Sequence, residues 1–137
     1  MIYKKSWKYI LFKDDSCWSY KFLYRIKSLK DFSNISKNDM GGYIRGYYNL
    51  SQIGNCWVYD EAEISGKASV SGDVRVSEKA VIIGCARVTG NVQVSGNAVI
   101  TDNAVVCGEA KILEDTIVCG NTKIEHSVLT GGIYRRK

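Results

Sequence analysis

The chain has 137 residues, 45% of them hydrophobic, and a formal net charge of +5 at pH 7. This length suffices for one compact unit and excludes two large domains. No apolar run reaches the ~18 residues of a membrane-spanning helix, and the N-terminal residues lack the apolar core of a signal peptide. The sequence therefore predicts a cytoplasmic protein.

Residues 1–50 differ in composition from the rest of the chain. They contain twelve of the fifteen aromatic residues, and ten basic residues against four acidic ones. Residues 51–137 carry nine basic and ten acidic residues, so the positive charge is concentrated at the N-terminal end. Residues 18–26 alternate as a strand does, and residues 8–13 are a candidate hairpin partner. We predict a basic, aromatic cap over residues 1–50 that is rich in β-structure.

A six-residue repeat occupies residues 53–130. In each repeat an aliphatic residue follows a small residue by two positions, and a turn former such as Gly or Asp comes two positions later. The aliphatic series recurs from Val58 to Ile124 and is broken only at Thr130. The small positions are Cys56, Ala62, Ala68, Val74, Ala80, Ala86, Val92, Ala98, Ala104, Ala110, Thr116, Thr122 and Val128.

The repeat predicts a coil. Residues i and i+2 of a strand point to the same side, so each repeat directs two side chains inward and one outward. Gly and Asn then supply a bend every six residues, which a flat sheet does not need. We predict an all-β fold, a single-stranded parallel β-helix of triangular section over residues 51–131 with about four coils. An antiparallel sandwich is the alternative, and residues 132–137 are predicted to form a basic C-terminal tail.

The repeat resembles that of the hexapeptide-repeat proteins, which form left-handed β-helices. Here Gly lies two residues after the aliphatic position, as in Val94-Ser95-Gly96-Asn97-Ala98, whereas the family usually has Gly directly after it. The shifted pattern is similar to a phage and bacterial subgroup with GNAxVxGNAxV runs. Residues 23–32 and 40–44 and the motif Asn49-Leu50-Ser51-Gln52 resemble the same subgroup, aromatic N-terminal head included. The resemblance implies a left-handed coil.

The head is expected to cover the first coil, because a terminal coil has unpaired backbone groups and an open apolar core. Its side chains are also candidates for contact with nucleic acid or an acidic protein, since cations bind phosphates and aromatic rings stack on bases. These candidates are Lys4, Lys5, Lys8, Lys21, Arg25, Lys27, Lys30, Trp7, Trp18 and Tyr24.

Stacking the repeats at eighteen residues predicts three outward faces. The first carries Trp57, Arg75, Gln93, Lys111 and Leu129, and the third carries Ser69, Arg87, Val105 and Lys123. The second becomes apolar after Glu63, and its candidate interface residues are Val81, Ile83, Val99, Thr101, Ile117 and Cys119. A contiguous apolar patch usually marks an interface, so we predict a homo-oligomer, a dimer or trimer, through this face. Coverage by the head and docking of a foreign protein are the alternatives.

The sequence offers little machinery for catalysis. Many hexapeptide proteins are acyl-CoA-dependent acyltransferases that need a histidine base, but here the sole histidine, His126, occupies a turn position. One histidine cannot supply the three zinc ligands of a γ-type carbonic anhydrase. The corner with Asp60, Glu78 and Glu114 is interpreted as turn chemistry, and the five cysteines as free thiols. We predict no catalytic residue, no cofactor and no metal.

The predicted function is non-enzymatic binding through protein–protein contact. The resemblance to small phage-encoded proteins implies an inhibitor of a host system, such as an anti-CRISPR protein, that acts on a host protein or nucleoprotein complex in the host cytoplasm. A hexapeptide acyltransferase-like enzyme and a structural or assembly component are the alternatives.

Overall fold

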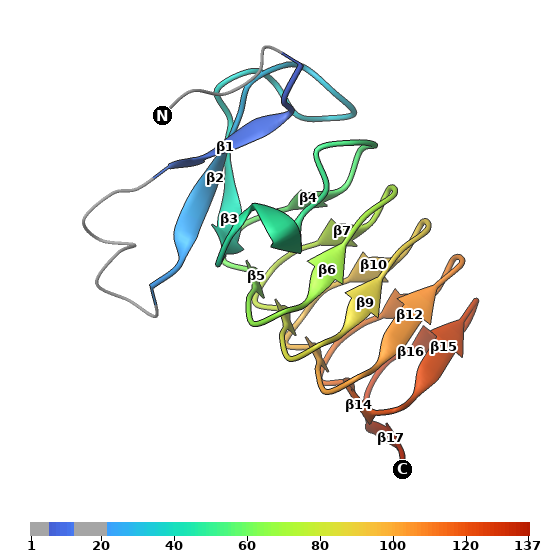
Figure 1. The fold of residues 1–137 in the computed structure, drawn as a ribbon. Helices are drawn as coiled ribbons and strands as arrows, with labels where there is room; N and C mark the ends of the chain where they lie inside the picture. The colour runs from blue at the N-terminus through green and yellow to red at the C-terminus, as the bar shows by residue number, and fades with distance from the viewer. Residues whose placement is uncertain (1–5, 13–21) are drawn as a thin grey trace.

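The computed structural model describes residues 6–12 and 22–137 and contains no α-helix among them (Figure 1). The chain forms the predicted parallel β-solenoid, with three sheets and about five turns where about four were predicted, and antiparallel strands lie at its N-terminal end. The head strands and the C-terminal strand lie at opposite ends of the solenoid (Figure 1). Within residues 6–12 and 22–137, no helix has the length and apolar character needed to span a membrane.

The solenoid strands are short and pair in parallel across successive coils. The first sheet contains β4 (Trp57–Val58), β7 (Arg75–Val76), β10 (Gln93–Val94), β13 (Lys111–Ile112) and β16 (Val128–Leu129). The second contains β5 (Glu63–Ile64), β8 (Val81–Ile82), β11 (Val99–Ile100), β14 (Ile117–Gly120) and β17 (Ile133–Arg136). The third contains β6 (Ser69–Val70), β9 (Arg87–Val88), β12 (Val105–Cys107) and β15 (Lys123–Glu125).

The core follows the repeat. Every small and aliphatic repeat position from Cys56 to Val118 is buried, with at most 1% of its surface exposed. The turn position has a positive φ, which Gly adopts without strain, as at Gly96 with φ 71°. Asp60 and Glu78 adopt the same conformation at the equivalent positions. The predicted inward and outward assignment is therefore confirmed over these coils.

The register changes in the last coil. Val81 pairs with Val99 eighteen residues later, but Lys111 pairs with Val128 and Ile117 with Ile133, steps of seventeen and sixteen residues. The prediction that Leu129 points outward is wrong, because Leu129 pairs with Ile112 and packs against the core while Val128 is 59% exposed. Thr130 cannot fill the aliphatic position, and the shorter step places Leu129 there instead. Residues 133–136, predicted as tail, form β17.

The head extends the second sheet. β1 (Tyr9–Phe12) pairs antiparallel with β2 (Tyr24–Ser28), so the first predicted strand has an antiparallel partner, but that partner lies at Tyr24–Ser28 and overlaps the predicted 18–26 only at residues 24–26. β2 pairs antiparallel with β3 (Met40–Ile44), and β3 pairs in parallel with β5. A short 3-10 helix, η1 (Tyr47–Asn49), leads to Leu50, which bridges to Val70 of the third sheet. The coil therefore begins at β3, within the segment predicted as cap.

The Asn49-Leu50-Ser51-Gln52 motif fastens the head to the first coil. The Asn49 amide is buried; its Nδ2 donates to the Ala68 carbonyl at 2.8 Å, and its Oδ1 accepts from the Arg45 and Gly46 N–H groups at 2.9 Å. The Gln52 amide accepts from the Lys8 N–H group at 2.6 Å and donates to the Tyr9 carbonyl at 3.0 Å. Two side-chain amides thus supply hydrogen bonds where the regular ladder has not yet started.

Candidate functional site

The predicted basic and aromatic contact residues divide into three groups. Lys4, Lys5, Trp18 and Lys21 lie outside the described residues. Trp7, Tyr24, Arg25 and Lys27 are half-buried in the head and Lys30 is exposed, whereas Lys8 is only 1% exposed. Lys8 as a contact to nucleic acid or an acidic partner is therefore a wrong prediction.

The Lys8 side chain is buried at the N-terminal end of the first coil. Its Nζ donates to the Cys56 carbonyl at 2.7 Å and to the Gly54 carbonyl at 3.2 Å, and it lies 3.2 Å from Cys56 Sγ and 5.3 Å from the Phe32 ring centre. Burial lowers the pKa of Lys8 and raises the pKa of Cys56. The ammonium group supplies donors to carbonyl groups at the top of the coil, so its charge has a structural role.

The aromatic residues of the head cover the same end. Trp57 is 1% exposed and meets the Tyr9 and Phe32 rings edge to face, with ring centres 6.3 and 5.3 Å away. Tyr9 is fully buried, its hydroxyl donates to the Leu50 carbonyl at 2.6 Å, and burial raises its pKa. Trp7 packs edge to face on Tyr47 at 5.1 Å. These contacts are those of a cap, and they engage Trp7, one of the rings predicted to stack on bases.

Two of the remaining predicted cations, Arg25 and Lys27, lie on the outer side of β2. Arg25 Nε donates to the Gly41 carbonyl at 3.1 Å, and its guanidinium lies 5.4 Å from the Tyr43 ring centre. Lys27 Nζ lies 5.8 Å from the Phe12 ring centre. These cations are thus engaged with rings and backbone of the head itself.

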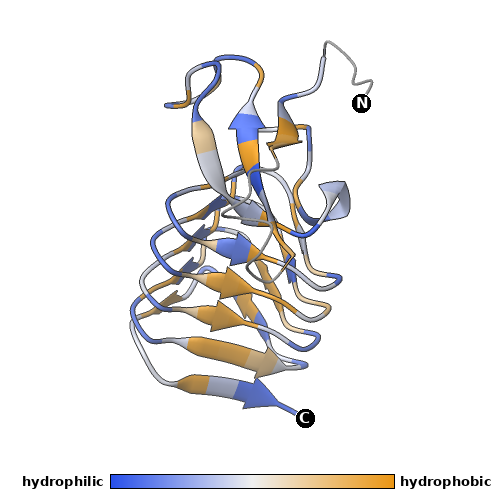
Figure 2. Ribbon diagram, turned by 90° about the vertical axis from the view of Figure 1, so that its left-hand side faces the viewer, coloured by the Kyte–Doolittle hydropathy of each residue, from blue (hydrophilic) through white to orange (hydrophobic). Residues whose placement is uncertain are grey.

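The predicted apolar face is formed by the outward side of the second sheet. Val81, Val99 and Ile117 follow one another in register on β8, β11 and β14, and Ile133 of β17 continues the column. Figure 2 looks onto this sheet and shows apolar residues on successive strands. Val81, Val99 and Ile117 are half-buried, Ile133 is 71% exposed, and Cys119 is buried. The structure brings these residues together on one flat surface, which we call the apolar face.

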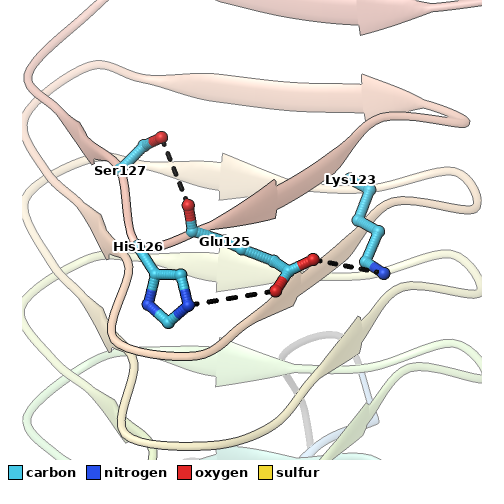
Figure 3. A network of polar contacts seen from close by, with 4 residues as sticks. All are labelled: Lys123, Glu125, His126 and Ser127. Carbon is cyan, nitrogen blue, oxygen red and sulfur yellow. Dashed lines mark hydrogen bonds and ion pairs between the residues drawn. The ribbon is translucent and has the colours of Figure 1, made fainter.

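His126 lies in a polar group near the C-terminal end (Figure 3). Its Nε2 is 3.9 Å from Glu125 Oε2, the other carboxylate oxygen is 3.3 Å from Lys123 Nζ, and the Ser127 hydroxyl donates to the Glu125 carbonyl at 3.4 Å. The His126 side chain is 67% exposed and has a φ of 58° in its turn. A base on open surface lacks the walls that would orient a substrate and exclude water.

A polar groove of about 300 Å³ lies beside the first sheet under the head and was not anticipated from the sequence. The Tyr59 hydroxyl donates to Asn34 Oδ1 at 2.9 Å, and burial raises the pKa of Tyr59. The groove holds one guanidinium and two carboxylates, so its lining carries a net charge of −1 and offers a charged partner to both an anion and a cation. Its lining residues are Asn34, Tyr59, Asp60, Arg75, Ser77, Glu78, Gln93 and Ser95. No group of three or more metal-ligating residues forms among the described residues.

The fold and its repeats define the class of protein: a parallel β-solenoid built from six-residue units on three sheets. No protein-family model matches the chain. Among curated proteins, it is similar to the "Uncharacterized acetyltransferase YdcK" of Escherichia coli (strain K12), with 33% identity over 75 residues. The match covers 48% of this chain and 23% of the relative, so it spans about a quarter of the relative's length.

Proposed function

We propose that the chain is a hexapeptide-repeat protein with a left-handed β-helix, and that it works by binding protein and not by catalysis. The repeat period, the three-sheet solenoid and the similarity to a protein named as an acetyltransferase support the family and its handedness. The binding role is supported mainly by one observation: apolar side chains that the core does not use gather on one flat face.

Acyl transfer is the second candidate, and the name of the relative favours it over an inhibitor of a host system. His126 would be the base, with Glu125 at 3.9 Å to orient its ring. A neighbouring subunit would have to supply the walls of the acyl-CoA site, because His126 is exposed on this chain.

One experiment separates the two candidates. The full chain and its His126→Ala variant are incubated with acetyl-CoA; binding is measured by titration calorimetry and released CoA by chromatography, since exposed Cys85 would react with a thiol reagent. A binding protein gives no saturable heat and the same slow CoA release in both samples. Saturable binding together with release that His126→Ala abolishes would establish acyl transfer and overturn the proposed function.

A further inference from the structure

The two edges of the apolar face carry opposite charge. Turn residues that precede the strands form the leading edge, and turn residues and strand ends that follow form the trailing edge. The leading edge has five acidic residues and one lysine, all exposed: Asp60, Glu61, Glu78, Lys79, Glu114 and Asp115. The trailing edge has four basic residues and one acidic, also exposed: Lys67, Asp102, Arg135, Arg136 and Lys137. An apolar strip therefore separates an acidic edge of net −4 from a basic edge of net +3.

We propose that the apolar face binds a second copy of the chain about a two-fold axis that lies in the interface and runs parallel to the solenoid. Such an axis places each coil at the same height as the same coil of the second copy, and it reverses the direction of the strands, so that the leading and trailing edges change sides. The leading edge of each copy then faces the trailing edge of the other, and Glu61 faces Lys67 of the second copy. The inference deepens the proposed binding function by naming the partner.

The charge pattern selects this axis among the face-to-face arrangements. A two-fold axis along the strands would reverse the coils but leave left and right unchanged, so the acidic edge would face itself. Like charges held together in that way disfavour the arrangement. The axis parallel to the solenoid is the one that places the acidic edge of each copy against the basic edge of the other, with Glu61 level with Lys67 and with Glu114 and Asp115 one coil from Arg135 and Arg136.

The apolar contacts fit the same arrangement. Packed sheets lie ~10 Å apart with their side chains interdigitated. The axis would pass between two columns of outward side chains, so Val99 would meet Thr101 of the second copy, and Ile83 would meet Val81 of the second copy. The half-buried valine and isoleucine side chains lose their remaining water contact, which is the main attraction, while the charged edges set the orientation.

The oligomeric state tests the surface. Sedimentation velocity is run on the wild-type chain under reducing conditions at up to about 100 μM, where a micromolar dissociation constant already populates a dimer. Val99→Lys at the centre of the face is compared with Gln93→Lys, an outward position of the same coil on the first sheet. We expect a dimer for wild type and Gln93→Lys, and a folded monomer for Val99→Lys. A monomeric or trimeric wild type, or a dimeric Val99→Lys, would overturn the inference.

Charge reversal tests the axis. The two-fold axis makes the contact between Glu61 and Lys67 occur twice. Glu61→Lys and Lys67→Glu each place like charges at both contacts, so each should raise the dissociation constant of the dimer roughly tenfold at low salt. The double variant should restore the dissociation constant. Weakening without rescue would reject this axis. A monomeric wild type that neither binds nor turns over acetyl-CoA would overturn the dimer and leave the binding function intact. Turnover of acetyl-CoA would overturn the proposed function whatever the oligomeric state.

Discussion

The two ends of the solenoid are built from similar side chains but differ in what covers them. At the N-terminal end Trp57 and Tyr9 are buried, and Lys8 and Tyr9 donate hydrogen bonds to carbonyl groups of the first coil. At the C-terminal end β15, β16 and β17 are all edge strands, and Ile124 and Leu129 on inward positions are only half-buried. The inward Tyr134 of the last strand is 36% exposed.

The difference shows that the repeat alone does not bury a coil. An inward residue is buried by coils on both sides, and a terminal coil needs other groups. The head supplies aromatic rings and donors at one end, and the described residues supply no equivalent at the other. We therefore expect the stability of each coil to depend on its distance from the head, and substitutions at both ends test how each end is stabilised.

Truncating an aromatic side chain should cost far more at the covered end. We expect Trp57→Ala to lower the free energy of unfolding by about 3–5 kcal/mol, because it leaves a cavity between Tyr9 and Phe32. Tyr134→Ala, the matched change at the other end, should cost ~1 kcal/mol because Tyr134 is partly solvated in the native state. Urea unfolding followed by circular dichroism measures both. Equal losses would show that the C-terminal coil is covered in solution.

Replacing the buried lysine tests how the head satisfies the first coil. Lys8→Met leaves the Cys56 and Gly54 carbonyls without their donor and should lower the free energy of unfolding by about 1–3 kcal/mol at neutral pH. The pKa of Lys8 is lowered in the folded state from 10.5, so the folded chain binds fewer protons than the unfolded one between those two values.

The stability contributed by Lys8 should therefore rise with pH across that window. The measurement is the difference in unfolding free energy between wild type and Lys8→Met as a function of pH. Burial raises the pKa of Cys56 from 9.0, which lowers stability above pH 9, and Lys8 partly opposes that rise, so the difference reports Lys8 alone only below pH 9. A difference that shrinks as the pH rises would contradict the burial of the charged group.

A smaller effect is expected at Thr116, which occupies a small repeat position near the C-terminal end where most other coils have alanine. Thr116 is buried, its hydroxyl donates to the Leu113 carbonyl at 2.6 Å, and it lies 3.1 Å from the Leu129 carbonyl where the register shortens. Thr116→Val keeps the shape and removes the hydroxyl, so we expect a loss of ~1 kcal/mol. Amide hydrogen exchange should locate the loss in the last coil. Ala110→Ser, at another small inward position, is a control that should not speed exchange there.

Much of the fold could be predicted because the repeat states it locally. Small and aliphatic residues at fixed spacing place each inward side chain, and stacking at eighteen residues placed Val81, Val99 and Ile117 on one face before any contact was known. The shortened last coil could not be predicted in this way. The break at Thr130 was visible, but whether the chain closes up or leaves a gap there depends on Leu129 finding the core.

The head was harder to interpret, since its residue types serve two purposes. A lysine among aromatic rings is typical of a nucleic-acid surface, yet Lys8 points into the coil because carbonyl groups of Gly54 and Cys56 lie there. Those acceptors are 46 and 48 residues away along the chain, so spacing gives no hint of them. Trp57 similarly occupies an outward repeat position and is buried because the head folds over it.

The stacking period has a consequence for how such a rod can change in length. Because Val81 and Val99 are eighteen residues apart and each sheet takes every third strand, a gain of eighteen residues lengthens the rod and leaves every wall in line. A gain or loss of six residues below β5 would instead turn everything downstream by a third of a revolution. The apolar face would then no longer lie in line with the outer surface of β2 and β3 that carries Arg25 and Tyr43. Insertion of whole eighteen-residue coils preserves the orientation of the head relative to the apolar face, and insertion of a single six-residue repeat changes that orientation.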